Sequence, residues 1–315
     1  MKKLMAAMLG LMVALASASL ACTGQAEAAD RMAAPAEGQA TGAVDAPVRQ
    51  LDGQLAYASD VDGDFEIWLQ ALDGSPPRQL TDHPAMDHSP AWSPDGQWLA
   101  FVSNRDGNEE IYRLAVDGSG LQRLTFTTQA AESFPAWSSD GLTISFDSDR
   151  GGDWDIYAMD ADGAAVRRLT NHPAEDWISH WSPDGQCLAF ESRRDGNYEI
   201  YVMRADGSQV RRLTDNPGVD SAPKWSPDGS RLAFFSQRDG RMALCFMQPD
   251  GSGVQFLASG AEDYSFPAWS SDGQWLAFTA GDDHASRLQI VAAAGGQAWT
   301  LLDNGARCWA PAWRP

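Results

Sequence analysis

The residues of this chain that offer chemistry are acidic and aromatic side chains placed at a constant distance from a recurring tryptophan. Five residues before six regularly spaced tryptophans lie Asp87, Glu132, Asp176, Asp220, Tyr264 and Cys308. Aromatic residues follow closely, at Phe134, Trp177, Phe266 and Trp309. Carboxylates brought together attract a cation or a basic peptide, and aromatic side chains supply much of the binding energy of protein interfaces. The spacing therefore indicates a candidate binding site, provided that the fold brings the repeats together.

No other group of residues in the sequence has the spacing of a catalytic or metal site. The chain has no Gly-x-Ser-x-Gly nucleophile motif, and His88, His180 and His284 lie apart without the spacing of metal ligands. Residues 60–66 offer oxygen ligands at alternate positions, as calcium prefers, but their glutamate comes too soon for an EF-hand loop. We therefore predict no catalytic residue, no metal ligand and no cofactor, and interpret residues 60–66 as an ordinary turn.

The tryptophans themselves mark an internal repeat. They recur at spacings of 45, 44, 44, 44 and 44 residues, as Trp92, Trp137, Trp181, Trp225, Trp269 and Trp313. In the first complete unit, turn signals of the Pro-Asp-Gly, Arg-Asp-Gly and Asp-Gly type separate four short β-type runs. We expect strands at residues 89–92, 99–103, 110–116 and 121–125. A repeat of this length with four strands is typical of one blade of a β-propeller.

The two ends of the repeat region complement each other. The chain stops at Pro311-Ala312-Trp313-Arg314-Pro315, an innermost strand without its turn, and the first unit starts with a turn that lacks the strand before it. Paired together, the two ends complete a blade and remove the unpaired edges of an open sheet. We therefore predict an all-β fold over residues 51–315, a six-bladed β-propeller of four-stranded blades whose ring is closed by pairing of the N- and C-terminal strands.

In such a ring, the positions just before the innermost strands surround one end of the central channel. The residues expected at this channel mouth are Asp87, Glu132, Asp176, Asp220 and Tyr264, with Phe134, Trp177 and Trp309 close by. The predicted ligand is a basic peptide or a loop of a partner protein. A bound cation is the less favoured alternative. The competing interpretation is that the acidic side chains only cap loops and bind backbone amides, as they do in many turns.

The N-terminal residues have the layout of an export signal. Two lysines precede an apolar run, and small residues then lead to Cys22 in Ser-Leu-Ala-Cys. We predict a signal peptide over residues 1–21, a lipid on Cys22, and a flexible tether over residues 22–50, whose composition cannot bury a core. Ordinary cleavage near Ala18 or Ala28 is the alternative. Either route predicts an exported protein of the periplasm or cell surface, which contacts a membrane only through a lipid anchor.

The charge of the chain argues against one class of partner. Lys and Arg number 23 against 43 Asp and Glu, which gives a net charge of −20. Nucleic-acid binding requires a face rich in Lys and Arg, so we expect no nucleic-acid partner. Loss of the two lysines in the predicted signal peptide leaves 21 basic against 43 acidic residues, a charge of −22.

The repeated motifs resemble those of the TolB propeller family. They read PxWSPDG, then LAF, then SxRDGxxEIY, then DG and RRLT, in five or six copies between about residues 51 and 315. The resemblance implies a six-bladed propeller of the bacterial envelope that binds other proteins and catalyses nothing. The resemblance further implies that, in TolB itself, the propeller engages a peptidoglycan-associated lipoprotein. A separate N-terminal α/β domain of TolB then reaches the inner-membrane machinery. The predicted tether stands here in place of that domain.

Two classes of function therefore remain. The first is a non-enzymatic protein-binding module of the cell envelope. The second is a propeller that uses its central channel, either as a metal-dependent lyase, lactonase or glycosidase or as a peptide- or glycan-binding protein. A tightly held stoichiometric metal would favour the second class, and a metal-free protein that binds an envelope partner would favour the first.

Overall fold

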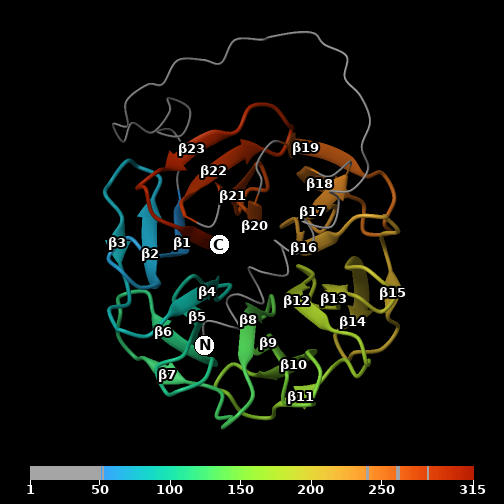
Figure 1. Cartoon of the computed structure of the whole chain (residues 1–315), viewed down its shortest axis with the longest axis horizontal. Coiled ribbons are helices and arrows are strands. Elements are labelled where there is room, and N and C mark those ends of the chain that lie inside the picture. Colours follow the sequence, from blue (N-terminus) through green and yellow to red (C-terminus); the bar gives the residue numbers. More distant parts are fainter. Residues whose placement is uncertain (1–50, 52, 239–240, 260–262, 282–283) are drawn as a thin grey trace, which may run out of the picture. The chain divides into compact units, whose positions relative to one another are not determined.

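The computed structural model describes residues 51, 53–238, 241–259, 263–281 and 284–315. The predicted signal peptide, Cys22 and the predicted tether lie in residues 1–50, outside the described residues. Every regular element in the described part of the chain is a β-strand, and the strands form six four-stranded sheets. The sheets are arranged around a common axis as blades (Figure 1). The prediction of an all-β, six-bladed propeller is confirmed.

Each blade has one innermost strand beside the axis. The innermost strands are β4 (Asp87–Trp92), β8 (Glu132–Trp137), β12 (Asp176–Trp181), β16 (Asp220–Trp225), β20 (Asp263–Trp269) and β24 (Cys308–Trp313). The second strands are β1 (Gln54–Ser59), β5 (Trp98–Ser103), β9 (Thr143–Ser148), β13 (Cys187–Ser192), β17 (Leu232–Arg238) and β21 (Trp275–Gly281).

The outer half of each blade is smaller. The third strands are β2 (Glu66–Ala71), β6 (Glu110–Ala115), β10 (Asp155–Asp160), β14 (Glu199–Arg204), β18 (Arg241–Met247) and β22 (Ser286–Ala292). The outermost strands are β3 (Arg78–Gln79), β7 (Gln122–Arg123), β11 (Arg167–Arg168), β15 (Arg211–Arg212), β19 (Gln255–Ser259) and β23 (Trp299–Leu302). All neighbouring strands within a blade are antiparallel, as short hairpin turns require.

All four strands of the first complete blade differ from the prediction at a boundary, two of them by a single residue, because β5 begins at Trp98 and β6 ends at Ala115. The innermost strand of the first complete blade begins at Asp87 rather than at residue 89, because Asp87 already pairs with Ser103 and its N–H donates to the carbonyl of Phe65 at 2.7 Å. The acidic residue is therefore the first residue of the strand and not part of the preceding loop. The outermost strand is reduced to Gln122–Arg123, because only these two residues pair with β6.

The first blade contains both ends of the repeat region. Its strand order is β24-β1-β2-β3, and Leu55 of β1 lies opposite Trp313 of β24. Beyond the paired strands, Arg307 forms an ion pair with Asp60, with 2.7 Å between its Nη2 and the carboxylate. In Figure 1 the red β24 lies beside the blue β1. The predicted closure of the ring is confirmed.

The hydrophobic core lies between the blades. The second strands contribute a buried aromatic residue at one equivalent position, namely Tyr57, Phe101, Phe146, Phe190, Phe234 and Phe278. Repeat tryptophans contribute to this core, as where Trp225 and Phe234 of one blade pack with Ile200 of the blade before it. Because both faces of each sheet are covered by neighbouring blades, apolar residues occur on both faces of the second strands.

A Ser-Pro-Asp-Gly or Ser-Ser-Asp-Gly motif builds the turn after five of the six innermost strands. In the first copy the Ser93 hydroxyl accepts from the N–H of Trp98 at 2.9 Å, and an Asp95 oxygen accepts from the N–H of Gln97 at 3.0 Å. The same bonds recur at Asp140, Asp184, Asp228 and Asp272. The acidic residues of this motif therefore stabilise turns through their own side chains, as predicted from the sequence.

Candidate functional site

The four acidic residues of the predicted channel mouth are buried at the start of the innermost strands. Asp87, Glu132, Asp176 and Asp220 are each 0% exposed. Each forms an ion pair with an arginine 18 residues later, at 2.6 Å to Arg105, 2.7 Å to Arg150, 2.9 Å to Arg194 and 3.7 Å to Arg238. Because the arginine is supplied from within the same blade, the negative charge of each carboxylate is largely balanced inside the wall.

Serine and aromatic residues hold these arginines in place. The Nε–H of Arg194 donates to the Ser192 hydroxyl at 2.9 Å, and its guanidinium lies over the rings of Phe190 and Tyr201, at 5.5 and 4.9 Å from their centroids. Equivalent stacking occurs at Arg105 and Arg150. Such cation–π contacts add roughly 0.5–2 kcal/mol each when partly buried. These arginines were not among the predicted site residues, although the repeated SxRDG motif and its constant distance from the acids were a sufficient signal.

Burial opposes ionisation at two of these acids, because it raises the pKa of Asp220 as well as that of Glu132. It raises the pKa of Glu132 to about 7, although the hydrogen bonds from Arg150 and Ser148 lower it. The ion pair between Glu132 and Arg150 nevertheless has a short, direct geometry, so the arginine remains the principal partner of this carboxyl group.

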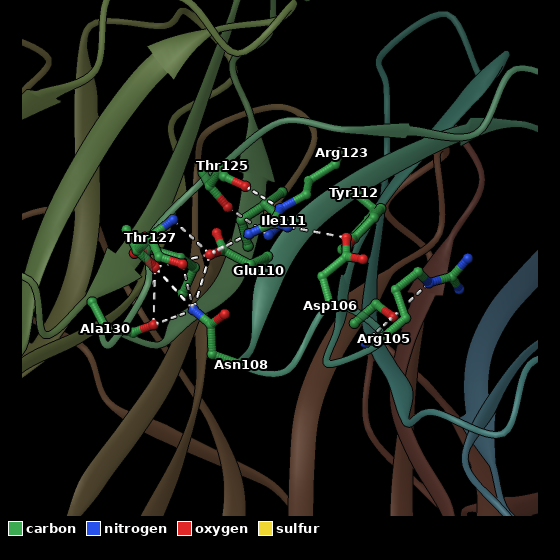
Figure 2. A network of polar contacts seen from close by, with 12 residues as sticks. Arg105, Asp106, Asn108, Glu110, Ile111, Tyr112, Arg123, Thr125, Thr127 and Ala130 are labelled. Carbon is green, nitrogen blue, oxygen red and sulfur yellow. Dashed lines mark hydrogen bonds and ion pairs between the residues drawn. The ribbon is translucent and has the colours of Figure 1, made fainter.

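A second set of acidic residues begins the third strands and anchors the loops that lead to the next blade. Figure 2 shows the network around Glu110, whose Oε1 accepts from Arg123 at 2.9 Å and from the N–H of Thr127 at 2.6 Å. Asn108 also reaches across the loop and donates to the carbonyl of Ala130 at 2.6 Å. The corresponding acids in other blades are Glu66, Asp155 and Glu199. These contacts position the start of the next innermost strand.

Two further buried acids lack an arginine. Asp147 accepts from the N–H of Ile178 at 2.7 Å, and Glu191 accepts from the N–H of Ala222 at 2.9 Å. Burial raises the pKa of Asp147 well above its usual value and that of Glu191 to about 7. The sequence signal for both was an acid at a second-strand position where three of the other four blades have an apolar residue, such as Val102.

The N–H groups that these two acids bind belong to a bulge in the innermost strands. The register shifts within all six of these strands. At the bulge, positive φ values occur at Ser89 (52°), Phe134 (46°), Ile178 (54°), Ala222 (52°) and Ala310 (48°). Non-glycine residues in this left-handed region cost roughly 1–3 kcal/mol each, so the surrounding structure must hold them there. The bulge interrupts the alternation of side chains and re-aims the residues that follow.

The aromatic residues of the predicted site meet across the ring. Phe134 of β8 contacts Phe266 of β20, with 5.0 Å between their centroids, and these two strands lie on opposite sides of the axis (Figure 1). Trp309 lies 6.2 Å from Phe134 and 5.8 Å from Phe266, and Trp177 lies 6.2 Å from Phe134. We refer to Phe134, Trp177, Phe266 and Trp309 as the aromatic cluster. It fills the middle of the central channel.

The edges of the aromatic cluster remain partly exposed. Phe134 and Phe266 are buried, whereas Trp177 and Trp309 are of intermediate exposure. Trp154 stacks on Trp177 with 4.1 Å between ring centroids, and His88 lies 5.3 Å from Trp309. The cluster thus joins innermost strands of four blades, with His88 of a fifth blade beside it, and presents two tryptophans toward the end of the channel where those strands begin.

Two families of propeller domains match parts of this chain. Residues 171–315 match the TolB β-propeller domain, and residues 60–151 match the N-terminal β-propeller domain of the Tricorn protease. TolB from Acinetobacter baumannii is 24% identical with a TM-score of 0.75, over 84% of this chain and 67% of that chain. A putative TolB from Agrobacterium tumefaciens is 25% identical with a TM-score of 0.65, over 84% of this chain and 99% of that chain. The chain contains a TolB-type β-propeller.

Other similarities are shorter or weaker. The Tol-Pal system protein TolB of Desulfosudis oleivorans is 41% identical over 49 residues, which are 16% of this chain and 11% of that protein. An oligogalacturonate lyase from Vibrio parahaemolyticus shares 16% identity with a TM-score of 0.58, over 80% of this chain and 74% of that chain. At this identity the lyase shows a shared fold and nothing about activity.

Within the TolB-type propeller, the predicted site residues divide into two groups. The four acids are held inside the wall by arginines, and Phe134, Trp177 and Trp309 form one cluster. Tyr264 lies on β20 opposite Ala280, and its side chain is outside the described part of the structure. Cys308 is buried, 3.9 Å from the Ser59 hydroxyl, and burial raises its pKa to about 12. Binding at this channel mouth stays a prediction.

The turn at residues 60–66 of the TolB-type propeller is occupied by protein contacts. The N–H of Gly63 donates to the carbonyl of Asp60 at 3.0 Å, the Asp60 side chain pairs with Arg307, and Glu66 binds Thr81 and the N–H of His83. Across the described residues, no three His, Cys, Asp or Glu side chains come together as a metal site. The described segments also contain no helix of the length and apolarity needed to cross a membrane.

Proposed function

We propose that this TolB-type propeller is an exported, non-enzymatic interaction module of the bacterial cell envelope. The proposal rests mainly on the aromatic cluster, whose two partly exposed tryptophans stand at one end of the channel on a rigid ring. Tryptophan is over-represented among the residues that dominate protein–protein binding energy. The matching relatives named TolB, one of them assigned to the Tol-Pal system, support a partner within the envelope.

The partner that fits this face is an envelope protein that inserts a segment with basic character. Trp177 and Trp309 would contact the apolar part of the segment, since tryptophan buries a large area with little loss of side-chain freedom. The net charge of −20 accelerates the approach of a basic partner, although the four buried acids act mainly through their arginines as supports for the site. A metal-dependent enzyme is the second candidate, and no contact among the described residues favours it.

The binding proposal predicts a large effect from the exposed tryptophans. The double variant Trp177→Ala/Trp309→Ala should bind the peptidoglycan-associated lipoprotein of the same cell at least about 30-fold more weakly, because loss of a central tryptophan costs about 2 kcal/mol or more. Isothermal titration calorimetry of the purified proteins measures this change. Trp98→Ala is the matched control, because Trp98 is also partly exposed but begins the second strand β5, away from the aromatic cluster.

Two results would contradict the binding proposal. If the two cluster tryptophans had no greater effect than Trp98→Ala, the binding face would lie elsewhere. If the wild-type protein did not bind this lipoprotein at all, the proposed partner class would be wrong.

The membrane attachment that we propose depends on Cys22. A bacterial lipoprotein carries several acyl chains, which together hold a protein stably on a membrane. We expect Cys22→Ser to move the protein from the membrane fraction to the soluble envelope fraction, as measured by fractionation and immunoblotting. Cys187→Ser is the control, since Cys187 lies on β13 within the propeller. Retention of both variants in the membrane fraction would exclude this anchor.

A further inference from the structure

The end of the channel opposite the exposed tryptophans contains a cavity. It has a volume of about 290 Å³ and is lined by the ends of all six innermost strands and the turns that follow them. Phe134 and Phe266 of the aromatic cluster are among its lining residues, so the cluster separates it from the other channel mouth. The cavity is therefore distinct from the surface proposed above for a protein partner.

The lining of this cavity contains no acidic residue, although Asp and Glu number 43 in the chain. Its ionisable side chains are His180, Lys224 and Arg314. Arg314 is already engaged, because it donates to Gln54 at 3.2 Å and lies over the Trp92 ring at 5.2 Å. The rest of the lining is mostly Trp, Pro, Ala and Ser. Apart from the α-carboxylate of Pro315, which is also among the lining residues, the wall of this cavity is free of acidic groups, and this favours an anionic ligand.

Lys224 is exceptional in sequence and in contacts. The chain has three lysines, and the other two are Lys2 and Lys3, so every other basic residue of the propeller is an arginine. Lys224 directly precedes a repeat tryptophan, where four other blades have alanine at positions 91, 136, 268 and 312. It forms no ion pair with any described residue. Burial alone lowers its pKa to about 8, so the ammonium is charged at neutral pH but lacks a counter-ion.

His180 occupies the same position in the neighbouring blade and supplies a second donor. Its Nδ1 accepts from the N–H of Trp225 at 3.3 Å, which places the proton of the neutral ring on Nε2. Burial, and then the charge of Lys224, hold the pKa of His180 well below its usual value. The ring is therefore a neutral donor beside a cationic one, on β12 and β16.

We propose that this cavity binds a carboxylate carried on a small apolar body, with the carboxylate oxygens on the Lys224 ammonium and the His180 Nε2–H. One positive and one neutral donor balance the single charge of a carboxylate, and charge-assisted hydrogen bonds of this kind are among the stronger ones in proteins. The Trp, Pro and Ala side chains of the wall suit an apolar body, as in most ligand pockets. This inference does not depend on the proposed protein partner. The carboxylate can belong to a free organic acid or to the C-terminus of a peptide.

The single lysine in the propeller allows a direct test. Full-length protein labelled with [ε-¹³C]lysine has three lysine signals, and the signal that disappears in Lys224→Met belongs to Lys224. We expect benzoate or N-acetyl-Ala-Phe with a free carboxylate to shift this signal and to raise the pKa of Lys224, because a bound anion stabilises the ammonium. Benzamide and the amidated dipeptide should bind about tenfold more weakly or not at all.

The variants and probes separate the possible outcomes. Lys224→Met should weaken binding of the acids about tenfold without affecting the amides, whereas Arg241→Met, on the exposed start of β18, should change neither. Lys224→Gln serves the same purpose if the methionine variant does not fold. Binding of benzoate supports a free acid as the natural ligand, and binding of the dipeptide acid alone supports a peptide terminus. The proposal is overturned if neither acid moves the Lys224 signal, if the amides bind equally well, or if binding survives the loss of Lys224.

Discussion

Deletion of residues 310–315 should lower the melting temperature of the propeller by about 10–20 °C. The deletion removes most of β24, which is the innermost strand of the first blade and pairs with β1. Trp313 is 8% exposed and packs in the cluster that contains Leu55 and Tyr57, so its loss leaves a cavity. Removing a buried tryptophan together with its strand pairing costs on the order of 5 kcal/mol, and each kcal/mol changes the melting temperature of a domain of this size by about 2–4 °C.

The truncated ring should also aggregate on heating, because β1 then presents an unpaired edge. Differential scanning calorimetry and light scattering measure the two effects. Deletion of Pro315 alone is the matched control, because this residue is exposed and follows the last strand. Equal melting of the truncated and control proteins would show that the pairing between β24 and β1 contributes little to the stability of the ring.

The fold was predictable because the same sequence motifs recur in successive blades. A tryptophan at a nearly constant spacing and turn motifs of fixed type define each blade, and the incomplete units at both ends predict the closure. Strand boundaries were less predictable, because pairing extends beyond the apolar run. Asp87 joins the innermost strand through its backbone, although its side chain is polar. The outermost strands are short because they pair on one side only, and no residue pattern marks where such pairing ends.

The candidate site was predictable in position but not in contacts. A repeat places equivalent residues at the same height in every blade, so one position was predicted for all the acids, just before the innermost strand, whereas the structure makes them the first residues of that strand. Side chains of a regular strand point alternately to its two faces, but this alternation did not predict the direction of each side chain here. The bulge, with positive φ at residues such as Phe134, interrupts the alternation. Contacts between opposite blades, such as Phe134 with Phe266, depend on ring diameter, which the sequence does not encode locally.

The largest single-residue effect is expected at Arg194. Both oxygens of the fully buried Asp176 lie 2.9 Å from the Arg194 Nη2. Replacement by methionine in Arg194→Met retains much of the apolar stem but leaves a buried carboxylate without its partner. Breaking a buried ion pair on one side costs about 3–5 kcal/mol, so the urea midpoint at neutral pH should fall substantially.

Two further variants determine whether the ion pair is responsible for this loss. Arg193→Met is the matched control, because Arg193 is exposed and its contact with Glu175 is 3.6 Å long, the kind of surface pair that contributes about 0–1 kcal/mol. In the double variant Asp176→Asn/Arg194→Met the buried charge is gone, so a substantial part of the stability should return. If Arg193→Met and Arg194→Met destabilised the protein equally, or if Asp176→Asn restored nothing, the buried ion pairs would not be what holds the innermost strands in place.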